Sequence, residues 1–288
     1  MNAPAPKLAI IAGGGQLPLK LAEVCAETGR AYVVVALSGW ADDTVTDHPH
    51  RWCQVGEQGA LMKYLKDEAV QEIVLVGNVQ RPDFKNLKID WAGAKLLPKV
   101  LMAARKGDDA LLRVLIENFE AHGFAVVGAH DVMSALLIEK GPLGRIGPDE
   151  DAMVDITKAR EVVTAMGALD IGQGAVVVNG LVLAVEAAEG TDAMLERVAD
   201  LRPEVRGDAN ARAGVLLKMP KPIQERRIDL PTIGQKTLHG AAKAGLKGIA
   251  VAAEGALVID REEVAALADR LGLFVVGIDE SIVKSTAP

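Results

Sequence analysis

The residue types best suited to chemistry gather in one stretch of the chain, from Lys218 to Thr237. It carries five cationic side chains and two acids, and its three prolines exclude a regular helix or a central strand. Adjacent arginines suit bidentate binding of phosphate, and an acid beside them can hold a hard cation. A solvated loop with local ion pairs is the competing interpretation. The charged residues are Lys218, Lys221, Glu225, Arg226, Arg227, Asp229 and Lys236.

A run of three glycines, Gly13-Gly14-Gly15, follows the first apolar segment of the chain, and a helical pattern comes next. Glycine leaves room for backbone N–H groups at a helix start to approach a phosphate. The spacing is not the GxGxxG of dinucleotide-binding proteins, so a tight turn without a ligand stays open. Gly77 and Asn78 close another apolar run, at the edge of a parallel sheet where ligands gather.

Two acids and an arginine surround the start of a predicted helix. Asp108 and Asp109 precede it, and Arg113 lies one turn further on. An aspartate in this place would cap the helix and complement its dipole. Capping explains one carboxylate, and the remaining acid with the arginine leaves room for a ligand role.

A second group of acids stands where a predicted strand passes into a helix. Its three carboxylates, close together in sequence, make a candidate site for Mg²⁺ or for the phosphate side of a ligand. Capping of the helix by Thr191 or Asp192 is the alternative, and the residues alone leave both open. The candidate residues are Glu186, Glu189, Gly190, Thr191 and Asp192.

Alternating apolar runs and helical patterns predict an α/β fold with two domains. The first, residues 1–140, has the strand, glycine turn and helix that begin a Rossmann-like parallel sheet. The glycine- and proline-rich segment 141–148 is the predicted linker. Residues 149–288 are expected to form a C-terminal mixed α/β domain. Because this domain contains the charged stretch, we expect it to be the catalytic one.

Two hairpins are predicted in the second domain. Asn179-Gly180 separates two apolar runs, and this dipeptide tolerates the positive φ angles of a type I′ turn. The apolar runs at 248–252 and 256–259 are expected to pair in the same way, through the Glu-Gly dipeptide between them.

A basic amphipathic helix is predicted from Ile89 to Lys106. Such a helix can lie on an anionic membrane surface. More often its apolar side packs inside its own protein, and the pattern does not choose between the two.

Composition narrows the classes of function. The chain has 288 residues, a net charge of −7 and a pI near 5.4, which argues against a general nucleic-acid binder. Its two cysteines, Cys25 and Cys53, lack CxxC spacing, which indicates a reducing compartment and neither a disulfide framework nor a cysteine–zinc site. Since no apolar run approaches the ~18 residues of a membrane span, we expect a cytoplasmic protein that at most lies against a membrane.

The segment 226–234, Arg-Arg-Ile-Asp-Leu-Pro-Thr-Ile-Gly, resembles the signature of the LpxI family, the UDP-2,3-diacylglucosamine pyrophosphatases of lipid A synthesis. Six other stretches are similar to that family in the same order, so the resemblance spans nearly the whole chain. Glu225 stands where the family's pattern has Asp, and the charge is kept. The six stretches are 11–15, 77–79, 107–113, 127–130, 187–192 and 274–277.

The resemblance implies hydrolysis of UDP-2,3-diacylglucosamine to UMP and 2,3-diacylglucosamine 1-phosphate (lipid X). It implies Mg²⁺ as the cofactor and an attacking water directed at the phosphorus that is bonded to the sugar. It also implies peripheral contact with the inner membrane, where the lipid substrate lies, and it allows for a homodimer. An apolar trough between the domains would hold the acyl chains.

Within this chemistry four charged residues of the stretch, together with Glu186, receive an expected role. Asp229 is the metal ligand or water-positioning base, and Glu186 is a second metal ligand. Arg226, Arg227 and Lys218 complete the catalytic set as clamps on the diphosphate. The expected substrate contacts are Gly13, Gly14, Gly15, Gly77, Asn78, Asp108, Asp109, Arg113, Glu189, Gly190, Thr191, Asp192 and Thr232.

A noncatalytic protein that binds a nucleotide sugar or a dinucleotide through the first domain is the alternative hypothesis. The charged stretch argues against it, because this stretch lies in the other domain and is richer than binding alone needs. A dehydrogenase is a weaker third hypothesis, since the glycine spacing is wrong for a dinucleotide.

Overall fold

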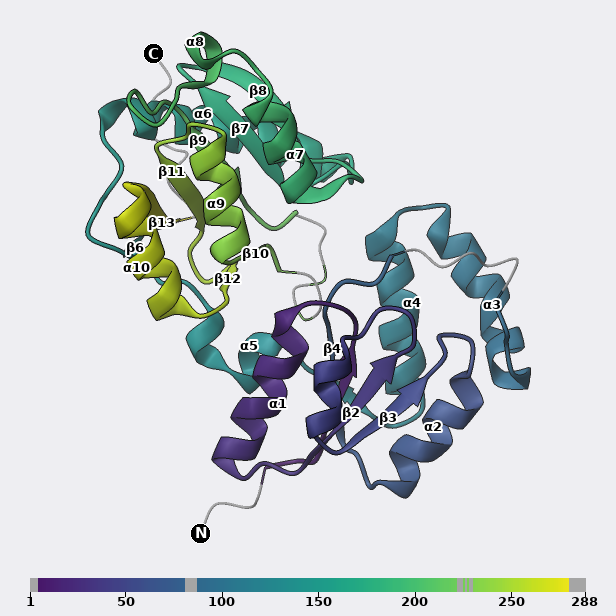
Figure 1. The fold of residues 1–288 in the computed structure, drawn as a ribbon. Coiled ribbons are helices and arrows are strands. Elements are labelled where there is room, and N and C mark those ends of the chain that lie inside the picture. The colour runs from purple at the N-terminus through teal and green to yellow at the C-terminus, as the bar shows by residue number, and fades with distance from the viewer. Residues whose placement is uncertain (1–4, 81–86, 222–224, 226, 228–229, 280–288) are drawn as a thin grey trace. The chain divides into compact units, whose positions relative to one another are not determined.

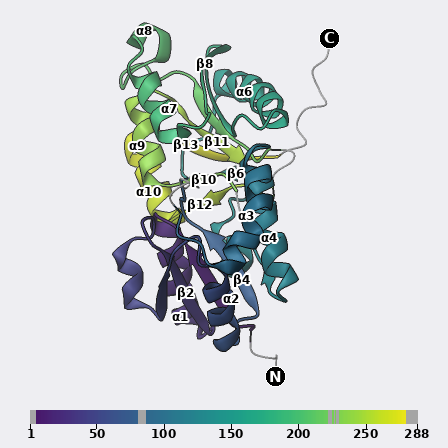
Figure 2. The same ribbon diagram turned by 90° about the vertical axis from the view of Figure 1, so that its right-hand side faces the viewer.

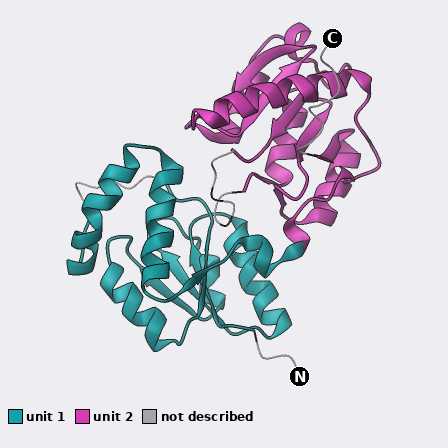
Figure 3. Ribbon diagram, turned by 180° about the vertical axis from the view of Figure 1, so that it is seen from behind, with its two compact units in different colours: residues 1–134 teal, residues 135–288 magenta. Residues whose placement is uncertain are grey.

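The computed structural model divides into two compact units, residues 1–134 and 135–288 (Figure 3). Each unit has its own sheet and its own helices. The division falls before the predicted linker at 141–148, and β6 (Gly141–Pro142) inside that segment pairs with a strand of the second sheet. The described residues are 5–80, 87–221, 225, 227 and 230–279.

The first unit contains a five-stranded parallel sheet in the order β3-β2-β1-β4-β5 (Figure 1). The predicted Rossmann-like parallel sheet is therefore confirmed. All five residues of β1 are buried, as expected of a central strand that is covered on both faces. The strands are β1 (Leu8–Ala12), β2 (Tyr32–Leu37), β3 (His50–Cys53), β4 (Glu72–Val76) and β5 (Ala125–Val126).

Figure 1 shows α1 on one side of this sheet and α2 and α4 on the other. Helix α1 packs on β1 and β2, and α3 packs on α2 and α4. The Asp90 carboxylate caps α3 by accepting a hydrogen bond from the Gly93 amide at 2.8 Å. The helices are α1 (Gln16–Thr28), α2 (Gln58–Asp67), α3 (Trp91–Ala104), α4 (Asp108–Ala121) and α5 (Ala129–Val132), with a 3-10 turn η1 (Asp43–Asp47).

The second unit contains a six-stranded mixed sheet in the order β6-β13-β11-β9-β7-β8, which confirms the predicted mixed α/β fold. Strands β9, β11 and β13 run parallel, whereas β7 is antiparallel to both of its neighbours. A separate two-stranded sheet joins β10 to β12. The strands after β6 are β7 (Gly174–Val178), β8 (Leu181–Val185), β9 (Val215–Lys218), β10 (Thr232–Ile233), β11 (Gly248–Ala252), β12 (Leu257–Val258) and β13 (Phe274–Ile278).

Helices cover both faces of this sheet, with α6 on one face and α7, α9 and α10 on the other (Figure 2). Ile156 of α6 belongs to the same hydrophobic cluster as Leu217, and Leu238 of α9 to the same cluster as Leu216. Successive residues of β9 thus fill opposite layers, as strand geometry requires. None of the helices in the described part of the chain is long and apolar enough to cross a membrane. The helices are α6 (Glu150–Ala168), α7 (Gly190–Ala199), α8 (Pro203–Arg206), α9 (Gln235–Lys243) and α10 (Arg261–Leu271), with a 3-10 turn η2 (Ser134–Leu136).

The hairpin predicted around Asn179-Gly180 is confirmed. Asn179 has φ 50° and Gly180 has φ 78°, the positive values that a type I′ turn needs. The Asp155 carboxylate, 2% exposed, accepts hydrogen bonds from both turn amides, at 3.0 and 2.7 Å. The buried Asp155 carboxylate on α6 therefore stabilises the turn through two hydrogen bonds.

The second predicted hairpin is wrong. Strand β11 is flanked by β9 on one side and by β13 on the other, so it has no free edge for the segment that follows it. Strand β12 pairs instead with β10, in parallel. Long-range pairing of β11 with two parallel neighbours outweighs the local turn.

Candidate active site

The carboxyl edge of the second sheet brings together residues from three adjacent strands. Glu186 follows β8, Lys218 ends β9, and Gly174 begins the strand β7 that lies between them. Gly174 is opposite Lys218 in the β7–β9 pairing, and the Glu186 amide donates to the Gly174 carbonyl at 2.8 Å. The sheet register therefore places an acid and a base on either side of one glycine.

A chain of hydrogen bonds links that base to that acid through a hydroxyl group. Lys218 Nζ donates to Thr191 Oγ1 at 2.7 Å, and Thr191 Oγ1 donates to Glu186 Oε1 at 2.7 Å. Lys218 Nζ also donates to the Thr232 carbonyl at 3.4 Å. Lys218 is only 5% exposed and Glu186 only 7%, so both charges are held away from bulk water.

Glu186 has one oxygen left over. Its Oε2 is buried and has no hydrogen-bond partner among the described residues. A buried carboxylate oxygen without a partner is unfavourable, so it is suited to binding a further group. Gly174 leaves space for it, because a Cβ on that residue would lie 2.6 Å from Oε2.

The other two acids of this segment, Glu189 and Asp192, form ion pairs with different cations. Glu189 pairs with Arg197 at 2.6 Å, and Asp192 pairs with Lys236 at 2.6 Å. A hydrogen bond from its own backbone amide, with a further one from Arg197, lowers the pKa of Glu189, and the Asp192 hydrogen bond raises the pKa of Lys236. Within the described ranges, no three His, Cys, Asp or Glu side chains lie together as candidate metal ligands.

The predicted cap of α7 by Thr191 or Asp192 is wrong. Gly190 begins the helix, and Glu189 occupies the N-cap position. Thr191 lies inside the first turn, and its hydroxyl donates a hydrogen bond to Glu186. The hydrogen bond from Thr191 to Glu186 therefore takes the place of a capping bond to the helix backbone.

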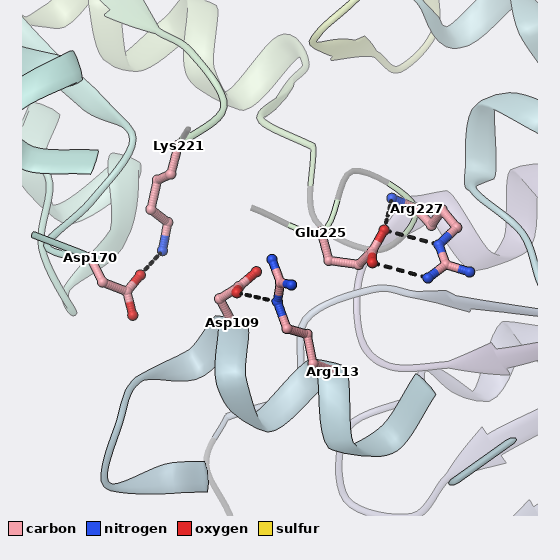
Figure 4. Close-up of polar contacts among 6 residues, drawn as sticks. All are labelled: Asp109, Arg113, Asp170, Lys221, Glu225 and Arg227. Carbon is pink, nitrogen blue, oxygen red and sulfur yellow. Dashed lines mark hydrogen bonds and ion pairs between the residues drawn. The ribbon is translucent and has the colours of Figure 1, made fainter. Parts of the chain in front are cut away.

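Part of the charged loop lies outside the described residues, including Arg226 and Asp229. Arg227 forms a two-pronged ion pair with Glu225, through Nε to Oε1 at 2.9 Å and Nη2 to Oε2 at 3.0 Å (Figure 4). Thr232 lies on β10, and its hydroxyl donates to the Leu230 carbonyl at 3.1 Å. The Glu225–Arg227 pair is of the local kind that a solvated loop would also form.

In the first unit, the predicted glycine turn donates its amides to the protein itself. The Gly13 amide donates to the Val76 carbonyl at 2.8 Å, and the Gly14 amide to the Asn78 carbonyl at 2.9 Å. The Gly15 amide donates to the carboxylate of Asp42 at 3.0 Å. Contact of these amides with a phosphate stays a prediction.

Close packing of two strand ends gives these glycines a structural reason. A Cβ on Gly13 would lie 2.7 Å from the Asn78 carbonyl oxygen. Gly77 has φ 91°, and a Cβ there would lie 2.8 Å from the Gly13 carbonyl carbon. The two segments can approach this closely only because both are glycine.

One of the two acids at the start of α4 has a partner in the same helix. Asp108 and Asp109 lie in its first turn, after Gly107 at the N-cap position, so the prediction that an aspartate caps this helix is wrong. Asp109 is buried and pairs with Arg113 Nε at 2.7 Å (Figure 4). Their predicted role in binding substrate stays a prediction.

Two acids with defined partners are missing from the sequence analysis. Asp42 accepts the Gly15 amide, and Asp170 pairs with Lys221 at 2.6 Å (Figure 4). Each lies in a connecting segment, far from its partner in sequence. No local pattern distinguishes such an acid from a solvated one.

Comparison with known proteins identifies the family. The model of the LpxI N-terminal domain matches residues 7–136, and that of the LpxI C-terminal domain matches residues 139–276. The chain belongs to the LpxI family. This LpxI-family chain is 54% identical over 273 residues to the UDP-2,3-diacylglucosamine pyrophosphatase LpxI of Caulobacter vibrioides, covering 95% of this chain and 98% of that protein. The family resemblance read from the order of the motifs is thereby confirmed.

Proposed function

We propose that this chain hydrolyses the pyrophosphate bond of UDP-2,3-diacylglucosamine to UMP and 2,3-diacylglucosamine 1-phosphate, as a Mg²⁺-dependent enzyme of lipid A synthesis. The observation that carries the proposal is the 54% identity, across nearly the full length of both chains, to a protein with that activity in its name. We place the enzyme in the cytoplasm, with access to lipid substrate at the inner membrane.

Lys218 is the proposed cationic clamp on the diphosphate. The two acceptors that its ammonium group meets among the described residues, a hydroxyl and a carbonyl, are both uncharged. Its positive charge is therefore not cancelled by a direct carboxylate contact and can stabilise charge that develops on a phosphate oxygen. Burial strengthens this interaction, because water screens it less.

Glu186 is a proposed Mg²⁺ ligand, and Asp229 is proposed as the second ligand or as the base that positions the attacking water. The unpartnered buried Oε2 of Glu186 fits this role, since a hard cation prefers carboxylate oxygens. When bound, Mg²⁺ would neutralise charge on the diphosphate. Arg226 and Arg227 would contact the same anion, for which Arg227 has to exchange its carboxylate partner Glu225 for phosphate oxygens.

The proposed reaction is attack of water on the phosphorus bonded to the sugar. Asp229 orients the water and accepts its proton, while a new bond forms between the water oxygen and that phosphorus. The bond from this phosphorus to the bridging oxygen breaks, and UMP leaves with the bridging oxygen.

Hydrolysis of the substrate in ¹⁸O-labelled water, with Mg²⁺ or with EDTA, tests this proposal. We expect turnover with Mg²⁺ only, and ¹⁸O in the sugar phosphate but not in UMP, measured by mass spectrometry of the separated products. ¹⁸O in UMP would show that water attacks the other phosphorus, the one bonded to uridine. Tight binding without turnover would favour the noncatalytic binding protein instead.

A further inference from the structure

Helix α3 leaves a row of apolar side chains exposed. Trp91 is 75% exposed, Met102 62% and Leu101 40%, and Ala94 and Pro98 are exposed between them. At 3.6 residues per turn these positions share one side of the helix. The opposite side carries Gly93, Val100 and Ala103, which are buried where α3 packs on α2 and α4.

Positive charge lines this exposed row. Lys95 and Lys99 lie on the helix, Arg105 and Lys106 follow it, and the segment from Trp91 to Lys106 contains no acid. By helical spacing, Lys95 and Lys99 fall along the same flank of the apolar row. Lys95 Nζ lies 3.4 Å from the centre of the Trp91 ring, a cation–π contact, so positive charge and the indole stand side by side on this face.

This combination indicates what covers the face. Burial of this face inside a protein would suit the apolar row. It would also remove several lysine charges from water, which is energetically costly. The surface of an anionic bilayer satisfies both parts, because apolar side chains enter the acyl boundary while lysines meet the headgroups. Tryptophan is also enriched at that depth of a bilayer.

We propose that the exposed face of α3, formed by Trp91, Ala94, Pro98, Leu101 and Met102 with the adjacent lysines, binds the surface of a bilayer that contains anionic phospholipid. The inference rests on the proposed function only for the reason to bind a membrane, since an enzyme that uses a diacylated substrate would take it from such a surface. Binding itself requires neither substrate nor catalysis.

Helix α2 of the same unit supplies a matched control. Lys63 and Lys66 are exposed on it, whereas its larger apolar side chains Leu61, Met62 and Leu65 are buried. Reversing two charges on α2 changes the net charge of the protein as much as reversing two on α3. A difference between the two variants therefore reports on the exposed face of α3 rather than on overall charge.

The experiment is sedimentation of the full chain with phosphatidylcholine vesicles, made with or without phosphatidylglycerol. We expect binding to the anionic vesicles and little to the neutral ones. Each cation near an anionic surface contributes about fivefold to binding. Lys95→Glu with Lys99→Glu should therefore lower partitioning by about 25-fold or more, because two cations are lost and two anions are added. Lys63→Glu with Lys66→Glu should leave it within about threefold of the unmodified chain. A blue shift of tryptophan emission on adding vesicles should be lost in Trp91→Phe.

Several outcomes would overturn the inference. These are an unmodified chain that does not sediment with anionic vesicles, equal losses in the α2 and α3 variants, or a fluorescence shift that persists in Trp91→Phe. Self-association that Trp91→Ala abolishes would assign the face to a second copy of the chain. Turnover of detergent-dispersed substrate, measured in parallel, tests the proposed function separately, because it needs no bilayer.

Discussion

At the carboxyl edge of the first sheet, the amides of Gly13, Gly14 and Gly15 all donate to acceptors of the protein itself. At the carboxyl edge of the second sheet, a buried Glu186 keeps an oxygen with no described partner, and a buried Lys218 meets only uncharged acceptors among the described residues. Both edges are places where ligands of α/β proteins bind. The first uses its polar groups to join strand ends, whereas the second retains polar groups that a ligand can use.

This difference teaches that position at a sheet edge does not by itself make a site. A backbone amide that already has an acceptor gains little by exchanging it for another. A buried charge whose contacts are uncharged still has most of its electrostatic interaction available. We therefore expect substitutions at the second edge to affect turnover, and substitutions at the first edge to affect mainly the stability of the fold.

The largest effect is expected from Asp229→Ala, in the charged stretch 218–237. Loss of a group that positions water or metal should lower kcat by about 10²- to 10⁴-fold. Substrate should still bind, because the cationic clamps remain. Steady-state kinetics and direct binding measure the two effects, with circular dichroism as the check on folding. A kcat within about threefold of the unmodified enzyme would remove Asp229 from the catalytic set.

Lys218→Met should come next. It keeps an aliphatic chain of similar length and removes the buried charge, so we expect kcat/KM to fall by about 10²-fold or more. Lys218→Arg is the control that keeps the charge and should recover part of the activity. The prediction fails if the methionine variant is as active as the arginine variant.

Glu186→Gln separates two roles for the buried acid. Glutamine keeps an oxygen that can accept the Thr191 hydroxyl, but it carries no charge. If Glu186 holds Mg²⁺, the Mg²⁺ concentration for half-maximal activity should rise about tenfold or more. A Mg²⁺ titration of the initial rate measures this. A lower kcat with an unchanged Mg²⁺ requirement would instead make Glu186 the distant counter-charge of Lys218.

Thr191→Val is expected to have a moderate effect. It removes the hydroxyl that links Lys218 to Glu186 and leaves the lysine in an altered position, so we expect kcat to fall by about tenfold. Thr191→Ser keeps the hydroxyl and should stay within about threefold. The kcat of both variants, at saturating substrate and Mg²⁺, checks the prediction, and equal losses would contradict a positioning role.

The smallest effect on turnover, and a clear one on stability, is expected from Gly77→Ala at the first edge. Its φ of 91° and the 2.8 Å approach to Gly13 should lower the free energy of unfolding by about 1–3 kcal/mol. Gly123→Ala is the matched control, because Gly123 has φ 93° but no atom within 4 Å of its Cβ position. The melting temperature of Gly77→Ala should therefore be the lower of the two. Should its folded form show a raised KM, Gly77 would belong to the substrate site after all.

Local geometry explains what the sequence by itself determined. The Asn179-Gly180 turn follows from two residues that tolerate positive φ, whatever surrounds them. The parallel first sheet follows from buried apolar runs separated by helical patterns, and the family follows from the order of short motifs along the chain. Glu186 and Lys218 could be selected from the sequence because acids and bases at strand ends are conspicuous.

Tertiary structure alone decided which partner each of these side chains has. Glu186, Glu189 and Asp192 lie together in sequence, yet each has a different partner. Helix α7 presents Thr191 to Glu186 and Arg197 to Glu189, and α9 presents Lys236 to Asp192. The pairing of β12 with β10, against the local turn signal, has the same origin. Turn conformation depends on two residues. The contacts of Lys218 with Thr191 and of Lys236 with Asp192 depend instead on the packing of elements that are distant in sequence, which no local pattern encodes.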